Sequence, residues 1–97
     1  MMYAIAVEVN SETSISPVER WLAQNFPDRI RVLPHLWIVE GALAGEQIRT
    51  AIEPLLGAND RLVVTKTARE ALSHGLPGES VGWLKEHFPD SMTNRIP

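Results

Sequence analysis

Glu8 is the residue of this sequence whose type and position best suit it to chemistry. It lies near the end of YAIAVEVN (residues 3–10), a stretch whose alternating side chains are typical of a short β-strand. A carboxylate at the end of a strand, just before a polar loop, is well placed to bind a hard cation such as Mg²⁺. One carboxylate makes a poor site, but in a two-fold dimer Glu8 and its mate could face each other across the axis. The alternative is an exposed acid where the strand leaves the core, and the spacing leaves both interpretations open.

The other residues that could do chemistry form no catalytic motif. The three histidines, His35, His74 and His87, belong to separate predicted elements and lack metal-binding spacing, which favours structural or surface roles. The serines form no nucleophile elbow, the glycines form neither a P-loop nor a dinucleotide fingerprint, and there is no cysteine. Glu8 therefore stands as the single candidate for catalysis and for metal binding, with Mg²⁺ or Mn²⁺ as the cation.

Length and charge narrow the classes of function. The 97 residues, of which 44% are hydrophobic, make one domain with a small core, for which dimerisation would be a natural supplement. Nine Lys and Arg against 12 Asp and Glu give a net charge of −3, which argues against tight non-specific binding of nucleic acid. Two local groups of basic residues, Arg29 with Arg31 and Arg61 with Lys66 and Arg69, are interpreted as ordinary solvated charges.

The sequence has no signal-peptide pattern and no apolar run close to the roughly 18 residues that a membrane helix needs. We therefore expect a soluble, cytoplasmic protein without a membrane partner.

Hydrophobic periodicity predicts the elements that position Glu8. Strands are expected at residues 3–9, 29–33, 36–40 and 61–65, and helices at 16–26, 44–56 and 80–88. In the first strand one face is bulky and suited to packing under helices, while Ala4, Ala6 and Glu8 share the other face. The bulky residues are Tyr3, Ile5, Val7 and Val9. The small alanines suit the second face to close approach by a partner subunit.

Local signals set the expected ends of the helices. Ser16 is predicted to cap the first helix, with Pro17 at its first position and Glu19 completing a capping box. Pro54 should kink or tighten the end of the second helix. Residues 68–76 could extend the fourth strand, form a loop or begin a short fifth strand, so the structure of residues 68–80 is left open.

The resulting order, β-α-β-β-α-β with a C-terminal appendage, predicts an α+β protein of the ferredoxin-like class, with an antiparallel sheet and two helices on one face. Residues 1–88 are expected to form a single domain with a C-terminal strand or helix extension, and residues 89–97 a flexible tail.

Several segments resemble the small SinR-like proteins, which are similar to the second CRISPR-associated family (Cas-two) and to VapD toxins. The segments are YAIAVEVN, HLWIVEGALAGEQIRTAIEPLL, GANDRLVVTKTA and GESVGWLKEHF, so the resemblance extends from Tyr3 to about Phe88. None of these is a catalytic motif. The resemblance implies a ferredoxin-like homodimer, often with a C-terminal segment that reaches the partner's sheet.

In the nuclease members of Cas-two an aspartate near the end of the first strand, paired with its dimer mate, is thought to bind Mg²⁺ for cleavage of RNA or DNA. The matching position here is Glu8, whose extra methylene moves the carboxylate by more than about an ångström, a displacement that metal sites tolerate poorly.

Two hypotheses follow. The first is a non-catalytic homodimeric interaction or scaffold protein that binds nucleic acid or a protein partner. The second is a metal-dependent endonuclease, acting on RNA or DNA, that uses paired Glu8 carboxylates across the dimer.

Overall fold

The computed structural model describes residues 1–10 and 12–88. Its elements are β1 (Met2–Glu8), α1 (Ser16–Asn25), β2 (Asp28–Leu33), β3 (Leu36–Glu40), α2 (Gly45–Ile52), β4 (Arg61–Lys66) and α3 (Gly78–His87). A short 3₁₀ turn, η1 (Glu53–Leu55), directly follows α2. The chain divides into two compact units, Met1–Lys66 and Thr67–Pro97, and each is described by itself.

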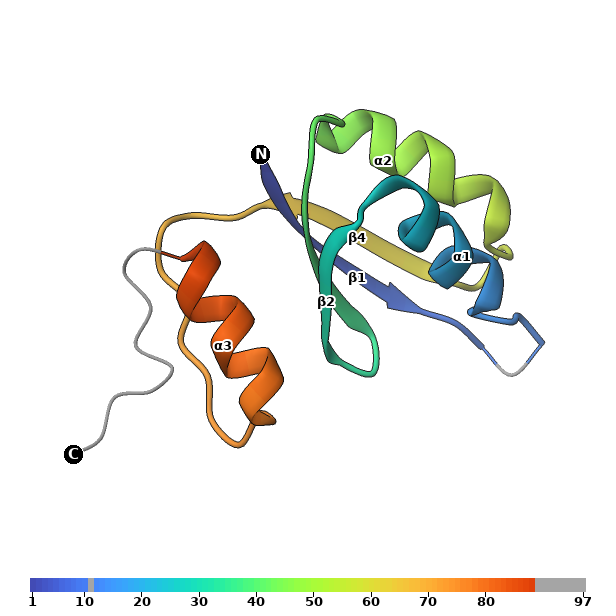
Figure 1. Cartoon of the computed structure of the whole chain (residues 1–97). Coiled ribbons are helices and arrows are strands. Elements are labelled where there is room, and N and C mark those ends of the chain that lie inside the picture. The colour runs from blue at the N-terminus through green and yellow to red at the C-terminus, as the bar shows by residue number, and fades with distance from the viewer. Residues whose placement is uncertain (11, 89–97) are drawn as a thin grey trace. The chain divides into compact units, whose positions relative to one another are not determined.

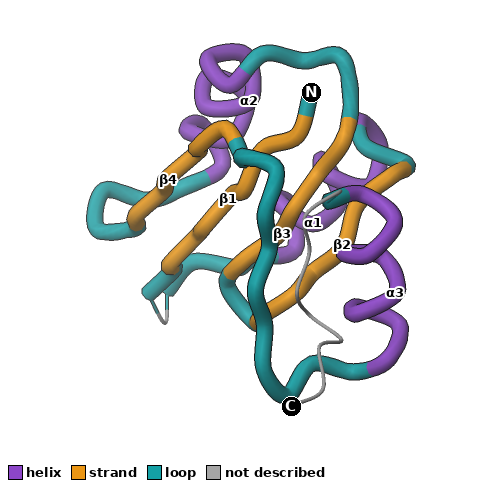
Figure 2. Tube along the Cα trace, turned by 90° about the vertical axis from the view of Figure 1, so that its left-hand side faces the viewer, coloured by secondary structure: helices purple, strands orange, loops and turns teal. Residues whose placement is uncertain are grey.

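The first unit is a four-stranded antiparallel sheet with strand order β2-β3-β1-β4 (Figure 2). Helices α1 and α2 lie together on one side of this sheet (Figure 1). This arrangement confirms the predicted α+β class and is compatible with the ferredoxin-like fold. Because β1 is central, its end is flanked by the turn before β3 on one side and by the start of β4 on the other.

The core lies between the sheet and its two helices. Ile5 and Val7 of β1, with 0% and 1% of their surface exposed, pack with buried residues of both helices, and Tyr3 and Val9 pack against the same cluster. The remaining members of the buried cluster are Val18, Leu22, Phe26, Trp37, Val39, Ile48 and Ile52. The predicted helix-facing side of β1 is therefore confirmed. Each of these aliphatic side chains contributes about 1.5–3 kcal/mol through burial.

The opposite side of the sheet, here called the second face, carries Ala4, Ala6 and Glu8 as predicted. Ala4 lies opposite Ile38, and Ala6 lies between Leu36 and Val63 in the ladder. Ile30 of β2 lies opposite Ile38 and joins the same face. Because residues opposite each other in a ladder share a face, aliphatic side chains from all four strands gather there.

The start of α1 corrects the predicted cap. The N-cap residue is Ile15, it makes no side-chain capping bond, and Ser16 is already helical. The backbone N–H of Ser16 donates to the Ser14 hydroxyl oxygen at 3.1 Å. The side chain that binds a backbone N–H at the start of the helix is therefore Ser14, two residues before the predicted cap. The expected capping box is wrong because the Glu19 carboxylate accepts a bond from Arg31 instead.

The end of α2 confirms the predicted effect of proline. The α-helix stops at Ile52, and the chain tightens into η1, which contains Pro54. Proline cannot donate the backbone bond that another α-helical turn requires, which accounts for the change of helix type.

The second unit contains α3, close to the predicted helix at 80–88, and residues 67–77 form no helix or strand. Within α3 the Trp83 and His87 rings stack at 3.6 Å with an interplanar angle of 7°. His87 Nδ1 also lies 2.8 Å from the Trp83 carbonyl oxygen.

The predicted tail at 89–97 lies outside the described residues. Across residues 1–10 and 12–88, every helix is too short or too polar to cross a membrane.

Candidate functional site

Glu8 ends β1 on the second face of the sheet and stands opposite Arg61, the first residue of β4. Its Oε1 lies 3.6 Å from Arg61 Nε, and the two side chains are 68% and 82% exposed. Such exposed ion pairs contribute about 0–1 kcal/mol, so little free energy holds the carboxylate to the guanidinium. Glu8 is accessible to a ligand.

Glu8 lines a hollow of about 290 Å³. Its polar lining is Glu8, His35 and Arg61, and Ala6 and Val63 are among its apolar walls. The Val7 N–H donates to the His35 carbonyl oxygen at 2.9 Å, which holds the β2–β3 turn against the end of β1. Glu8, His35 and Arg61 thus line one hollow from three neighbouring segments: the end of β1, the turn between β2 and β3, and the start of β4.

Sequence reasoning placed His35 apart from Glu8, and the structure brings them to one hollow. The two residues are far apart in the chain, and only the pairing of β3 beside β1 unites them. An antiparallel sheet was predicted without a strand order, and the strand order is the signal that would have placed the turn before β3 next to the end of β1.

The described residues include no group of three or more His, Cys, Asp or Glu side chains placed to hold a metal ion. In this hollow a single chain supplies one carboxylate. Because Mg²⁺ prefers near-octahedral oxygen coordination, further oxygens would have to come from a second subunit, a substrate or water.

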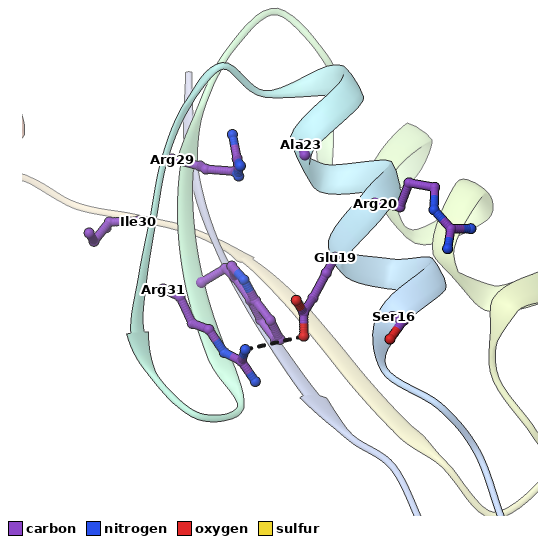
Figure 3. A pocket seen from close by; sticks show the side chains of 8 residues that line it. Ser16, Glu19, Arg20, Ala23, Arg29, Ile30 and Arg31 are labelled. Atoms are coloured by element: carbon purple, nitrogen blue, oxygen red, sulfur yellow. Dashed lines mark hydrogen bonds and ion pairs between the residues drawn. The ribbon is translucent and has the colours of Figure 1, made fainter.

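A second hollow, of about 600 Å³, lies between α1 and β2 (Figure 3). Arg31 is its best-held side chain. Its Nε and Nη2 donate to the Pro34 carbonyl oxygen at 3.1 and 2.6 Å, and its Nη1 donates to Glu19 Oε1 at 3.2 Å. The guanidinium carbon also lies 4.7 Å from the centre of the buried Trp37 ring, a cation–π contact.

Arg29 lies two residues earlier on the same side of β2, opposite Val39 as Arg31 is opposite Trp37. Its Nη1 donates to the Phe26 carbonyl oxygen at 3.1 Å, at the C-terminal end of α1. Arg20 also borders the hollow, but its guanidinium points to the other side of α1 (Figure 3). The interpretation of Arg29 and Arg31 as solvated charges missed these contacts. Their spacing in the sequence does place them on one face of the strand, and the pairing with β3 brings that face to Trp37.

Asp60 fixes the loops beside the end of β1. Its carboxylate oxygens accept the backbone N–H groups of Asn10 and Gly57, at 2.9 and 2.7 Å. These two bonds, with a smaller contribution from the Thr13 side chain, hold the pKa of Asp60 below its ordinary value. The loop that follows Glu8 is thereby tied to the segment that leads into β4.

No family model matches this chain, and no curated protein matches it. The resemblance to SinR-like, Cas-two and VapD proteins therefore stays a prediction.

Proposed function

We propose that the protein is a non-catalytic homodimeric interaction module whose two copies meet through the second face of the sheet. The observation that supports this is the apolar character of that face, where Val63 is 57% exposed and neighbours Ala6. Ile38 of the same face is only 9% exposed, so the open apolar surface centres on Val63 and Ala6. Exposed apolar surface is typical of sites of protein association. For a further macromolecular partner, the net charge of −3 favours a protein over a nucleic acid.

Charge also suits this face to a second copy of the chain. Glu8 and Arg61 lie side by side at one end of it, both largely exposed. In a two-fold contact residue i meets residue j while j meets i, so Glu8 could exchange its own Arg61 for the partner's Arg61 without leaving a charge unpaired.

Sedimentation velocity at micromolar concentration tests the proposal. We expect a dimer for the native chain and a monomer for Val63→Asp, because the added carboxylate would be buried against apolar surface. The matched control is Thr50→Asp, which adds the same charge at an exposed position of α2, on the other side of the sheet. A native chain that sediments as a monomer, or a Val63→Asp variant that remains dimeric, would refute the assignment.

A metal-dependent endonuclease is the second candidate, favoured by the exposure of Glu8 on the same face. Two Glu8 carboxylates brought together by the dimer could hold Mg²⁺ or Mn²⁺. Labelled RNA and DNA would be incubated with Mg²⁺, Mn²⁺ or EDTA and with native protein, Glu8→Gln or Glu8→Ala.

Under this second candidate, cleavage would require the metal and be lost in both variants. Cleavage of equal rate in native and Glu8→Ala protein would exclude Glu8 as the site. Absence of cleavage with either metal, from a preparation shown to be dimeric, would leave the interaction module as the function.

A further inference from the structure

The hairpin between β2 and β3 turns through only two residues, Pro34 and His35. Leu33 before them already pairs with Leu36 after them. Two-residue hairpins usually close with primed turns, which need a positive φ and match the twist of the strands. Proline fixes its φ at about −65°, and no described residue other than glycine has a positive φ. The turn is therefore of an unprimed type, which fits the strand twist poorly and needs support from elsewhere.

Arg31 supplies this support from the side of the sheet that the helices cover. Its Nε and Nη2 both donate to the Pro34 carbonyl oxygen, at 3.1 and 2.6 Å. Its guanidinium carbon lies 4.7 Å from the centre of the Trp37 ring, and Trp37 is the residue opposite Arg31 in the ladder. One side chain thus contacts both strands of the hairpin and the turn between them.

The peptide groups on both sides of the His35 Cα atom are held by hydrogen bonds. The Pro34 carbonyl belongs to the planar group before this atom, which Arg31 binds. The His35 carbonyl belongs to the group after it and accepts the Val7 N–H at 2.9 Å. Two fixed peptide planes that meet at one Cα atom fix φ and ψ there, and with them the direction of the Cα–Cβ bond. The bonds from Arg31 and Val7 therefore set the direction of the His35 side chain, which lines the hollow beside Glu8.

We propose that Arg31 is a positioning residue for the contact with a second copy of the chain, because it aims His35 at the hollow beside Glu8. The inference rests on the function proposed above, since Ala6 and Val63 of the second face are among the walls of this hollow. His35 is exposed, so a second copy that covers the second face can contact its ring. A correctly aimed imidazole offers the partner one flat surface and two nitrogen atoms for hydrogen bonds.

Glu19 has a smaller part in this arrangement. Its Oε1 lies 3.2 Å from Arg31 Nη1, and both side chains are close to half exposed, at 44% and 42% (Figure 3). Exposed ion pairs of this kind contribute little. The two bonds to the Pro34 carbonyl do not involve Nη1, so they persist without Glu19.

NMR on the full chain measures the direction of His35. The three-bond coupling between its amide and Hα protons reports φ, and its ring-proton signals report the surroundings of the imidazole. We expect an averaged coupling and shifted ring signals in Arg31→Lys, which keeps the charge but lacks the planar pair of donors. The matched control is Arg29→Lys, the same substitution on the same side of β2, because Arg29 binds the Phe26 carbonyl oxygen instead of the turn. It should leave the His35 signals as in the native chain.

A double-mutant cycle tests whether Arg31 acts on the contact through His35. Sedimentation velocity over a range of concentrations gives the dimer Kd of native protein, Arg31→Lys, His35→Ala and the double variant. We expect each single change to weaken the dimer about fivefold, the effect of one lost hydrogen bond. The double variant should also be about fivefold weaker, because without His35 the turn has no imidazole to aim. Two residues that act independently would give about 25-fold.

Native His35 coupling and ring signals in Arg31→Lys would overturn the proposal, and so would equal changes in Arg29→Lys. Additive losses in the double variant would also overturn it, since Arg31 would then act on the dimer by another route. A native chain that sediments as a monomer would refute the proposed dimer and the role of His35 in it. The NMR comparison would still decide whether Arg31 aims His35, so the two failures are distinguishable.

Discussion

Asp60 joins two loops of the first unit through the two oxygens of one exposed carboxylate. The Asn10 N–H binds one oxygen and the Gly57 N–H the other, so the loop after β1 and the segment before β4 are tied together. Asp60 sits at the near end of the ladder between β1 and β4, next to the Arg61 that pairs with Glu8. Neither of these bonds could be predicted from the sequence, because each joins Asp60 to a backbone group outside any local pattern.

The lowered pKa of Asp60 has a definite consequence for the pH dependence of folding. A carboxyl group whose pKa is lower in the folded state stabilises that state above its unfolded pKa, near 3.9, and loses this effect as the pH falls through the folded pKa. We therefore expect Asp60→Asn to melt at a lower temperature than the native chain at pH 7. The difference should shrink as the pH falls below about 4.

Thermal unfolding at pH 7, 4 and 2.5 measures this effect. Glu46→Gln, an exposed acid at the start of α2 whose nearest cation is Arg49, is a suitable control for the loss of one negative charge. A melting difference between Asp60→Asn and native protein that is the same at every pH would contradict the assignment of the effect to ionised Asp60.

At the scale of elements, periodicity predicted each strand to within one or two residues, because alternation and β-branched side chains act locally. The helix starts were harder to predict. Ser16, Pro17 and Glu19 match the capping pattern, yet Glu19 binds Arg31, a residue of the following strand. A competing tertiary partner of this kind has no signature in the segment that it alters.

Two glycines should respond to alanine in opposite directions. A Cβ at Gly41, just after β3, would lie 2.9 Å from two carbons of the buried Phe26 ring, whereas a Cβ at Gly82, inside α3, meets no atom within 4 Å. We expect Gly41→Ala to lower the free energy of unfolding by about 1–3 kcal/mol through overpacking. Gly82→Ala should stabilise α3 by about 0.5–1 kcal/mol by restricting the unfolded chain.

Urea unfolding reports the first change, and hydrogen exchange of the α3 amides reports the second. Gly78→Ala, at the first residue of α3 and also in open space, controls for the substitution itself. Full stability in Gly41→Ala would mean that the Phe26 ring moves aside without cost.

At the scale of the whole molecule, the order of elements was enough to predict the antiparallel sheet and its helix-covered face. The division at Lys66 was not predicted, because residues 67–77 carry no strong periodicity. The candidate sites show the same contrast between local and tertiary information. The place of Glu8 at the end of a strand was predicted from the sequence. The position of His35 beside it and the Glu19–Arg31 pair are seen only in the packed fold.

The two outer strands of the sheet differ in how they could receive another strand. β2 has an irregular register between Arg31 and Leu33 and carries two arginines, Arg29 and Arg31. β4 has a regular register, with cations only at its two ends. Bulges and charges prevent the addition of strands, so accidental extension of the sheet is confined to β4. Two chains joined edge to edge through β4 would form one eight-stranded sheet with β2 at both outer edges. The irregular register and the arginines of β2 would then disfavour further growth of that sheet.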